Sequence, residues 1–439
     1  MTRPYPSPAD TDPAPAGVAR LLSASLERPA DLAAHLAWFG PLPSVEQGSP
    51  TLTEVVDRSG LRGRGGAGFP TGRKLAAVAA AADSAGCRPV VVANGCEGEP
   101  VSSKDHLLLE VAPHLVLDGA AAVATALDAD EVVFCMHRGD PTIPWLRAAT
   151  AERTAERITP RLVEVPPRYV ASEESALVNF IDNGVGRPTT KPPRPYERGV
   201  HGRPTLIANV ETLAHLALIA RFGAEWFRAM GTADSPGTAL VTVGGAVHYP
   251  GVLEVELGAP LGALLDLAGG LAEPAQALLV GGIGGGWLPI DRAVGVRLDH
   301  ADLRAAGASL GVASVLAMPA TACGVTETAR IASYLAGESA RQCGPCMFGL
   351  PAVAADLWAL IYAVGDLPGV MQRLNRRLGL LPGRGACGHP DGFTRFVRGA
   401  LDTFGDDFRD HCHGRPCRWA GQSWLPVPTA GDPTPAGWR

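Results

Sequence analysis

Residues 60–74 read Gly60-Leu61-Arg62-Gly63-Arg64-Gly65-Gly66-Ala67-Gly68-Phe69-Pro70-Thr71-Gly72-Arg73-Lys74. Glycine lets backbone amides approach an anion closely and accepts a positive φ. Consecutive amides in such a loop form an anion-binding concavity, and a helix that begins just after it adds its dipole. The stretch therefore predicts a phosphate loop, with Lys74 as a point charge beside the phosphate.

The glycine spacing also fits the dinucleotide fingerprint, Gly63-x-Gly65-x-x-Gly68, but that fingerprint requires a strand before it. Here residues 52–59 have the pattern of a helix, and Gly60 is placed to end that helix as a C-cap. We therefore expect a phosphate loop that is not of the Rossmann type. The alternative is a glycine-rich connection whose arginines face solvent.

Length and composition narrow the class of protein. A chain of 439 residues is long enough for several domains, and a net charge of −6 gives no basic field for nucleic acid. Residues 1–16 lack the charged-then-apolar pattern of a signal peptide, and no apolar run approaches the ~18 residues of a spanning helix. We therefore expect a cytoplasmic protein without direct membrane insertion, which associates with a membrane only through a partner.

The first half of the chain divides into two parts. Residues 1–45 form a lead-in rich in proline and alanine, with a short helix over 18–36. Residues 46–235 alternate between strand-like and helical runs, which is typical of an α/β layer with a mostly parallel sheet. The expected strands are 89–93, 131–135 and 161–165, and the helices between them include 114–127 and 145–155.

The second half has three further parts. Residues 236–315 have the strands and the short helix of a small β-grasp-like domain, in which the glycines at 284–286 form a tight turn, because no helix follows them. Residues 316–415 return to helical periodicity and predict a small bundle. Residues 416–439 are rich in proline and glycine and predict a flexible tail.

Polar residues follow the expected strand at 89–93. Asn94, Glu97 and Glu99 come directly after it, and Lys104 lies a little farther on. Open α/β sheets bind ligands at the carboxyl ends of their strands. An asparagine there suits a flavin ring edge or a ribityl hydroxyl, and the two glutamates are acceptors for ribose hydroxyls. The alternative is an acidic turn on the surface.

Three more stretches have the character of a site, at 169–177, 186–193 and 208–212. In the first, Ser172 is placed to cap a helix that has Glu173 and Glu174 in its first turn, which favours the helix dipole. Capping does not explain the rigid, proline-rich segment that presents Lys191. The third stretch contains Asn209 and leads into a helix expected at 211–221.

Nine cysteines in a long chain without a secretion signal favour metal or redox use over a disulfide framework. Cys343 and Cys346 form a Cys-x-x-Cys pair, and Cys387 lies farther along. Such a pair places two thiolates on one metal or cluster, and a distant third closes the site. Zinc is an alternative, and so is a thioredoxin-like dithiol, although the βαβ context of that dithiol is missing.

In this order and spacing, these stretches resemble the flavin- and NADH-binding subunit of respiratory complex I, the 51-kDa or F subunit. That family includes subunits of soluble NAD-reducing hydrogenases and formate dehydrogenases. The resemblance covers residues 50–411. It implies an α/β FMN-binding domain, a β-grasp domain of the SLBB type, and a C-terminal helical bundle that carries one [4Fe–4S] cluster.

The resemblance also implies a role for individual residues. The phosphate and ribityl chain of FMN would be held by Gly63, Arg64, Gly65, Gly66, Gly68 and Lys74. The flavin would be lined by Asn94, Tyr169, Glu173, Glu174 and Asn209. The nicotinamide nucleotide would contact Phe69, Glu99 and Lys191, with Glu97 as a further acceptor for ribose. The cluster would be ligated by Cys343, Cys346 and Cys387.

Several positions depart from the family pattern. Ala340 stands where the first cluster cysteine is expected, so the fourth ligand is open. The candidate replacements are His389, Cys323, Cys412 and Cys417. A [3Fe–4S] cluster and the loss of the cluster are alternatives. Ala77 stands where an aromatic ring would stack on adenine, which implies weaker binding of NADH or a different donor. Cys96 replaces an acidic residue, and Ser172 replaces a glycine.

The function implied by this resemblance is hydride transfer from NADH to FMN. Single electrons then pass through the iron–sulfur site to a ferredoxin-like protein or a membrane-bound reductase component. No catalytic side chain is expected, because the flavin carries the chemistry. The acidic residues of the site disfavour the 2′-phosphate of NADPH. One alternative is a ferredoxin-coupled relay that resembles the C subunit of the Rnf complex. Another is a non-catalytic scaffold that has lost donor binding, which Ala77 and Ala340 favour.

Overall fold

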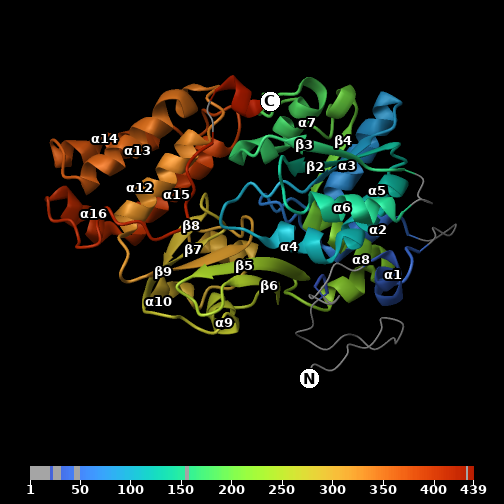
Figure 1. Ribbon diagram of the computed structural model, residues 1–439, viewed down its shortest axis with the longest axis horizontal. Coiled ribbons are helices and arrows are strands. Elements are labelled where there is room, and N and C mark those ends of the chain that lie inside the picture. Colours follow the sequence, from blue (N-terminus) through green and yellow to red (C-terminus); the bar gives the residue numbers. More distant parts are fainter. Residues whose placement is uncertain (1–19, 23–30, 44–49, 154–157, 432–433) are drawn as a thin grey trace.

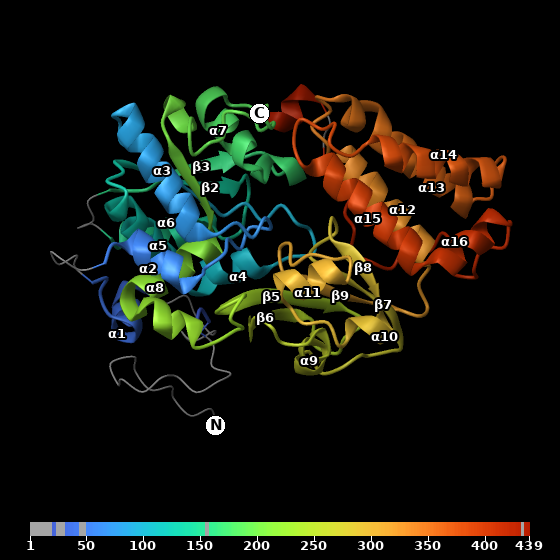
Figure 2. The ribbon, with the colours of Figure 1, turned by 180° about the vertical axis from the view of Figure 1, so that it is seen from behind.

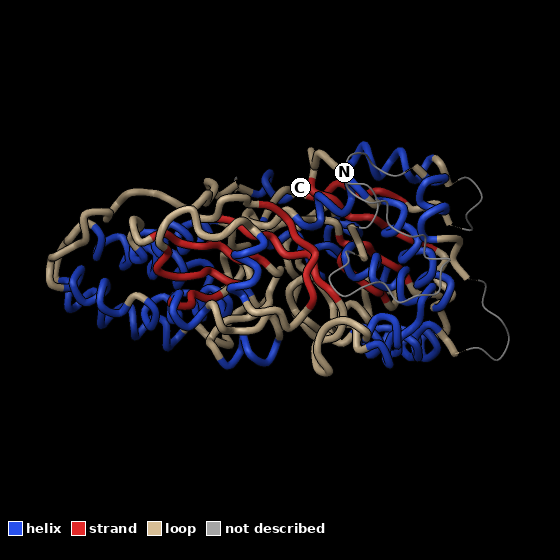
Figure 3. The backbone as a smooth tube through the Cα atoms, turned by 90° about the horizontal axis from the view of Figure 1, so that it is seen from below, coloured by secondary structure: helices blue, strands red, loops and turns tan. Residues whose placement is uncertain are grey.

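The computed structural model describes residues 20–22, 31–43, 50–153, 158–431 and 434–439. The chain forms three units (Figure 1): an α/β unit at one end, a bundle of helices at the other, and a second sheet between and below them. Seen from below, the molecule is elongated, and the helices of the bundle extend beyond the strands at one end (Figure 3).

The α/β unit is built on a parallel sheet of four strands in the order β3-β2-β1-β4. The strands are β1 (Val90–Asn94), β2 (Glu131–His137), β3 (Arg161–Val165) and β4 (Thr205–Asn209). The chain passes from β1 to β2 and β3 in one direction and then returns to the other side of β1. The topological switch point therefore lies between β1 and β4, where open α/β sheets bind ligands. The expected parallel sheet is confirmed.

Helices cover this sheet on both faces. They are α1 (Leu32–Phe39), α2 (Leu52–Ser59), α3 (Thr71–Ala85), α4 (Lys104–Val111), α5 (Pro113–Ala126), α6 (Ile143–Ala151), α7 (Glu174–Asn183) and α8 (Val210–Arg228). α5 packs closely on α8, because a Cβ on Gly119 would come within 1.9 Å of the Leu213 carbonyl oxygen. The helix expected at 18–36 is only partly present. Residues 20–22 are not helical, and α1 begins only at Leu32. Residues 23–30 lie outside the described residues.

The helix expected before the glycine loop is confirmed as α2. Thr51 and Glu54 form a capping box at its start, and Gly60 ends it in the left-handed region at φ 72°. The loop therefore leaves a helix rather than a strand, and α3 begins directly after it at Thr71. This order differs from the Rossmann arrangement, in which the loop follows a strand.

The second sheet is mixed, with the order β6-β5-β9-β7-β8. Its strands are β5 (Thr238–Gly245), β6 (Gly251–Glu256), β7 (Ala275–Val280), β8 (Gly286–Pro289) and β9 (Ser314–Pro319), with helices α9 (Leu261–Leu267), α10 (Ile290–Ala293) and α11 (His300–Ala305). β5 and β9 are parallel, while the other neighbours are antiparallel. The glycines at 284–286 lead from a turn into β8, so the expected tight turn is confirmed.

The bundle consists of α12 (Gly324–Gly337), α13 (Leu350–Ile361), α14 (Leu367–Leu380), α15 (His389–Thr403) and α16 (Gly405–Cys412). Its apolar core joins that of the second sheet through Trp287 of β8, whose ring lies 5.3 Å from Phe404 and 6.3 Å from Phe396. Thr403 Oγ1 donates to the Trp287 carbonyl oxygen over 3.0 Å. The two units therefore share one packed interface.

The described part of the C-terminal segment packs back on the protein, which differs from the expected flexible tail. Trp438 is only 1% exposed, and its ring lies 4.5 Å from the Arg168 guanidinium. The Gly186 amide donates to the Trp438 carbonyl oxygen over 2.8 Å. The end of the chain therefore lies beside α7 of the α/β unit (Figure 2). The large aromatic surface of Trp438 outweighs the low packing propensity of the residues before it.

In the described part of the chain, no single helix is both long and apolar enough to cross a membrane. α4 and α5 together pass that test by length and composition, but they are bent by 94°. Most of their residues are buried in the core of the α/β unit.

Candidate functional site

A cavity of about 360 Å³ opens at the carboxyl ends of β1 and β4, a volume typical of small-molecule sites. All three units contribute to its wall. The α/β unit supplies the glycine loop and the turns after β1 and before α7. The second sheet supplies Gly281, Gly284 and the loop 309–312, and the bundle supplies Cys387, His389 and Arg395. We call this cavity the switch-point pocket.

The structure brings many of the predicted site residues to this pocket. Those that line it are Arg64, Gly65, Gly66, Asn94, Glu97, Glu99, Tyr169, Glu173, Asn209 and Cys387. The predicted residues that are not part of its lining are Gly63, Gly68, Phe69, Lys74, Glu174, Lys191, Cys343 and Cys346. Phe69 is 54% exposed. Its contact with a nicotinamide nucleotide stays a prediction.

Asn94 and Asn209 end neighbouring strands and stand opposite one another in the register of the sheet. Asn94 Nδ2 donates to the Ser172 carbonyl oxygen over 3.0 Å. Asn209 Oδ1 accepts from the Glu211 amide and so caps α8, while its Nδ2 donates to Asp105 Oδ2 over 2.7 Å. Both side chains are thus fixed by protein contacts at the edge where a ligand would sit.

A buried charge network lies beneath these asparagines. Lys104 Nζ is 2.6 Å from Asp105 Oδ1 and 2.8 Å from Glu211 Oε2. Burial disfavours the Lys104 ammonium, but Asp105 and Glu211 outweigh burial and raise its pKa. Sequence reasoning missed Asp105 in this role. The available signal was a Lys-Asp pair at the start of an otherwise largely apolar helix.

Glu99 is a buried carboxyl of the pocket. It is 6% exposed, and burial raises its pKa to about 7. Its Oε1 accepts from the Ile283 amide over 3.0 Å, and the Tyr169 hydroxyl donates to its Oε2 over 3.4 Å. A Cβ on Gly282 would lie 2.5 Å from Glu99 Oε2, so this loop approaches closely only because glycine stands there. The turn before β8 therefore closes the pocket, a role that sequence reasoning missed.

The two lysines predicted to contact the cofactors are paired with protein carboxylates. Lys74 pairs with Glu174 and also donates to the Ile207 carbonyl oxygen over 2.6 Å. Lys191 pairs with Glu173. The contact of Lys74 with the FMN phosphate and the contact of Lys191 with the nicotinamide nucleotide stay predictions.

The structure decides two points of local structure that the sequence left to expectation: the N-cap of α7 and the exposure of Arg64. Glu173, not Ser172, is the N-cap of α7, because its carboxylate accepts from the Ser175 amide at 2.9 Å. A carboxylate reaches these amides from the capping position, whereas the Ser172 hydroxyl donates to the Tyr169 carbonyl oxygen instead. Arg64 does not face solvent, as the alternative interpretation of the loop required. It is 3% exposed and donates to the Thr238 carbonyl oxygen over 2.9 Å.

The three predicted cluster cysteines are neighbours, since Cys343 and Cys387 both interact with the Cys346 thiol. Cys346 is buried on a π-helical turn over Pro345–Gly349, a distortion that is frequent at functional sites. Burial raises the pKa of its thiol, and the neighbouring Cys343 and Cys387 raise it further. Ala340 is 6% exposed and packs in a small apolar cluster with Val170 and Trp438. A methyl group therefore occupies the position of the missing cysteine.

Three of the four candidates for the fourth cluster ligand lie at the end of α12 that is distant from Ala340. Cys323 is the N-cap of α12, and Ala340 lies beyond the other end of that 14-residue helix. At ~1.5 Å per residue, the two ends are about 20 Å apart. Cys323, Cys417 and Cys412 belong to that distant end and are excluded as ligands. His389 directly follows Gly388 and lies two residues after Cys387, and its Nε2 lies 2.8 Å from the Leu335 carbonyl oxygen.

The residues present fit a flavin nucleotide and, with one ligand fewer than usual, an iron–sulfur cluster. Gly66 lines the pocket at a φ of 107°, which favours glycine, and lies opposite Val312, whose Cγ1 is 3.8 Å from the position of a Cβ at residue 66. Amides, carboxylates and buried cations surround the pocket and supply both donors and acceptors. Three soft thiols supply all but one of the usual cluster ligands.

Comparison with known proteins identifies the family to which the chain belongs. The Nuo51 FMN-binding domain matches residues 56–218, the SLBB domain matches 240–286, and the NADH-ubiquinone oxidoreductase-F iron-sulfur binding region matches 326–411. The F subunit of the NADH-quinone oxidoreductase of Streptomyces coelicolor is 31% identical over 402 residues, which are 87% of this chain and 88% of the relative. The chain belongs to the family of F subunits of NADH-quinone oxidoreductase. The F subunit of Escherichia coli is 32% identical over 376 residues, 81% of this chain and 83% of the relative.

Membership of the F-type NADH-quinone oxidoreductase family agrees with the fold. The crystal structure of an NAD⁺-reducing [NiFe]-hydrogenase in the H₂-reduced state matches with a TM-score of 0.75 and 30% identity over 84% of this chain. This chain spans 63% of the length of that hydrogenase chain. The predicted fold class, with FMN-binding, SLBB and helical units, is confirmed, and so are the predicted FMN and iron–sulfur cofactors and the NADH dehydrogenase-type class of oxidoreductase.

Proposed function

We propose that the switch-point pocket holds FMN and receives the hydride of NADH there. Single electrons then leave through an iron–sulfur cluster at Cys343, Cys346 and Cys387 to a ferredoxin-like protein or a membrane-bound reductase component. The observation that carries this proposal is that Cys387 lines the same cavity as Gly65, Asn94 and Asn209. A cluster ligand in the wall of a flavin pocket gives electrons a short path from one cofactor to the other.

FMN, when bound, supplies the ability to accept two electrons together and release them singly. The protein positions it. The amides of Gly65 and Gly66 would hold the phosphate, and Asn94 and Asn209 would orient the polar part of the ring. The loop that carries Ile283 covers the pocket from the second sheet and excludes water. The buried Lys104–Glu211 pair fixes the starts of α4 and α8, and with them the ends of β1 and β4.

The structure weakens the expectation that the acidic residues of the site repel the 2′-phosphate of NADPH. Glu173 and Glu174 are paired with lysines, and burial raises the pKa of Glu99 to about 7. The repulsion that a 2′-phosphate meets is therefore weaker than the number of carboxylates suggests. We keep NADH as the proposed donor, in agreement with the names of the relatives, and expect a moderate preference rather than an absolute one.

Flavin loading tests the placement of the cofactor. In the Gly65→Val variant, a branched side chain enters the pocket beside Asn209, whose Cβ would lie 3.1 Å from an added Cβ. We expect this variant to purify with little FMN and without NADH:ferricyanide activity. Gly295→Val is the matched control, because nothing lies within 4 Å of a Cβ at Gly295. Full FMN content in Gly65→Val would contradict the placement.

A further inference from the structure

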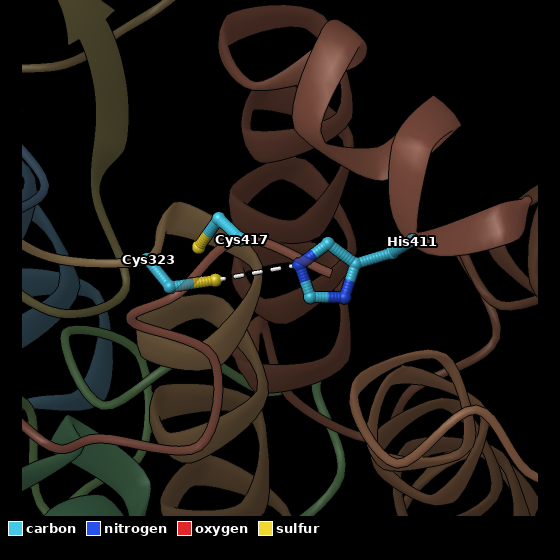
Figure 4. A group of neighbouring side chains, drawn as sticks. All are labelled: Cys323, His411 and Cys417. Atoms are coloured by element: carbon cyan, nitrogen blue, oxygen red, sulfur yellow. Dashed lines mark hydrogen bonds between the residues drawn. The ribbon is translucent and has the colours of Figure 1, made fainter. Parts of the chain in front are cut away.

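A second group of sulfur and nitrogen ligands lies at the start of α12 (Figure 4). The ligand atoms of Cys323, His411 and Cys417 all lie within 4.8 Å of one another. The three residues come from the start of α12, the last turn of α16 and the segment after α16. We propose that they bind a Zn²⁺ ion.

The spacing agrees with tetrahedral zinc. Zn–S bonds of about 2.3 Å and Zn–N bonds of about 2.0 Å place a sulfur and a nitrogen on one ion roughly 3.6 Å apart. Cys323 Sγ and His411 Nε2 are 3.6 Å apart. Two thiolates and an imidazole are ligands that select zinc over the hard cations, and two thiolates neutralise the charge of the ion.

The imidazole of His411 is oriented as a metal ligand. It is fully buried, and its Nδ1 lies 3.3 Å from the Leu360 carbonyl oxygen. A carbonyl oxygen only accepts, so Nδ1 carries the hydrogen. The neutral ring then has its lone pair on Nε2, which faces the sulfur of Cys323. A backbone acceptor on the second nitrogen is the usual partner of a zinc-bound histidine.

The two cysteines are positioned by contacts that do not need the ion. Cys323 Sγ accepts from the Thr326 amide over 3.4 Å at the N-terminus of α12. The segment that carries Cys417 is bound to the same turn. The Gly421 amide donates to Thr326 Oγ1 over 2.9 Å, and the Trp424 amide donates to Glu327 Oε1 over 2.8 Å.

A fourth ligand position remains; Asp407 lies near the three ligands, but its carboxylate oxygens are outside the group whose ligand atoms lie within 4.8 Å of one another. Asp407 precedes His411 by four residues on α16, so the two side chains share one face of that helix. Its carboxyl interacts electrostatically with both His411 and Cys417. The ion would tie the bundle to the segment that returns to the α/β unit, which is a structural rather than a catalytic role.

Metal content of the purified holoprotein tests this proposal. We expect about one zinc per chain in the unaltered protein, in addition to iron. In Cys323→Ser and Cys417→Ser we expect zinc to fall at least tenfold, while FMN and iron stay unchanged. Serine at 323 still caps α12, so the fold is preserved. Cys412→Ser is the matched control, since Cys412 is next to His411 but its sulfur contacts the Leu367 carbonyl oxygen instead.

A second measurement does not depend on variants. X-ray absorption at the zinc edge is expected to show two sulfur neighbours at about 2.3 Å and lighter atoms at about 2.0 Å. The proposal is overturned if protein expressed with added zinc contains none and mass spectrometry shows Cys323 and Cys417 as free thiols or as a disulfide. It is also overturned if both serine variants keep their zinc, or if they lose iron instead.

Discussion

Lys104 and Glu211 form an ion pair directly beneath the switch-point pocket, with Nζ 2.8 Å from Oε2 and side chains that are at most 2% exposed. The pair joins the first turns of α4 and α8, which follow β1 and β4. Burial opposes ionisation of Glu211, but Lys104, His215 and Arg64 outweigh it and lower its pKa to about 2. A charged contact thus fixes the edge of the sheet where the ligand site lies.

Removing the cation from this pair should destabilise the protein strongly. Lys104→Met leaves Asp105 buried without its ammonium partner and leaves Glu211 with Arg64, 3.7 Å away, as its remaining counter-charge. We expect the free energy of unfolding in urea to fall by about 3–5 kcal/mol. Lys74→Met is the control, because the side chains of Lys74 and Glu174 are 23% and 41% exposed and such a pair contributes at most about 1 kcal/mol. Equal losses in the two variants would contradict a special role for the buried pair.

Glu99 should make stability depend on pH near neutrality. Its pKa is raised from 4.5 to about 7, so the folded state keeps a proton that the unfolded state releases. The resulting stabilisation is present below pH 4.5 and is lost as the pH rises through 7, with at most about 3 kcal/mol involved. Glu99→Gln should flatten this dependence in urea unfolding, whereas Glu174→Gln should not. An unchanged slope in Glu99→Gln would rule Glu99 out as its source.

Restoring the missing cluster cysteine should stabilise the cluster. With three thiolates, one iron of a [4Fe–4S] cluster has no cysteine ligand, and we expect air to convert the cluster to [3Fe–4S], which low-temperature EPR detects. In Ala340→Cys the fourth thiolate should hold that iron and suppress the conversion. Ala355→Cys adds an exposed thiol on α13 and serves as the control. If Ala340→Cys converts as fast as the unaltered protein, position 340 does not face the cluster.

The packed C-terminal segment gives a further prediction. Trp438 is 1% exposed and contacts the apolar cluster that contains Ala340. Trp438→Ala should release the end of the chain, which limited proteolysis would detect, and should lower stability by about 3–5 kcal/mol. Trp145→Ala is the control, since Trp145 is 42% exposed. Proteolysis at the same rate in both variants would show that Trp438 does not anchor the segment.

Local patterns were the most predictable part of this protein. The helix before the glycine loop, its glycine cap and the valine-rich strand that ends at Asn94 all follow from neighbouring residues, and the structure confirms them. The parallel sheet follows from the alternation of strands and helices. The carboxyl end of β1 could therefore be singled out from the sequence alone.

Contacts between distant segments were not predictable in the same way. Nothing near Lys74 in the sequence shows that Glu174 is its partner. Nothing near Glu99 shows that the turn before β8 folds over it. Cys323 and Cys417 were considered as cluster ligands because they are cysteines, but a helix of known length places them at its far end. Such pairings depend on how distant segments pack in three dimensions, which a single sequence does not encode locally.

Electron transfer from NADH to a cluster beside the flavin pocket is tested most directly by an anaerobic NADH titration of the reconstituted protein, followed by visible absorbance and low-temperature EPR. We expect NADH to bleach the flavin and to produce a reduced iron–sulfur signal, and Cys387→Ser to keep the bleaching but lose the signal. Bound flavin that NADH leaves oxidised, but that reduced ferredoxin bleaches, would contradict this function and indicate a ferredoxin-coupled relay.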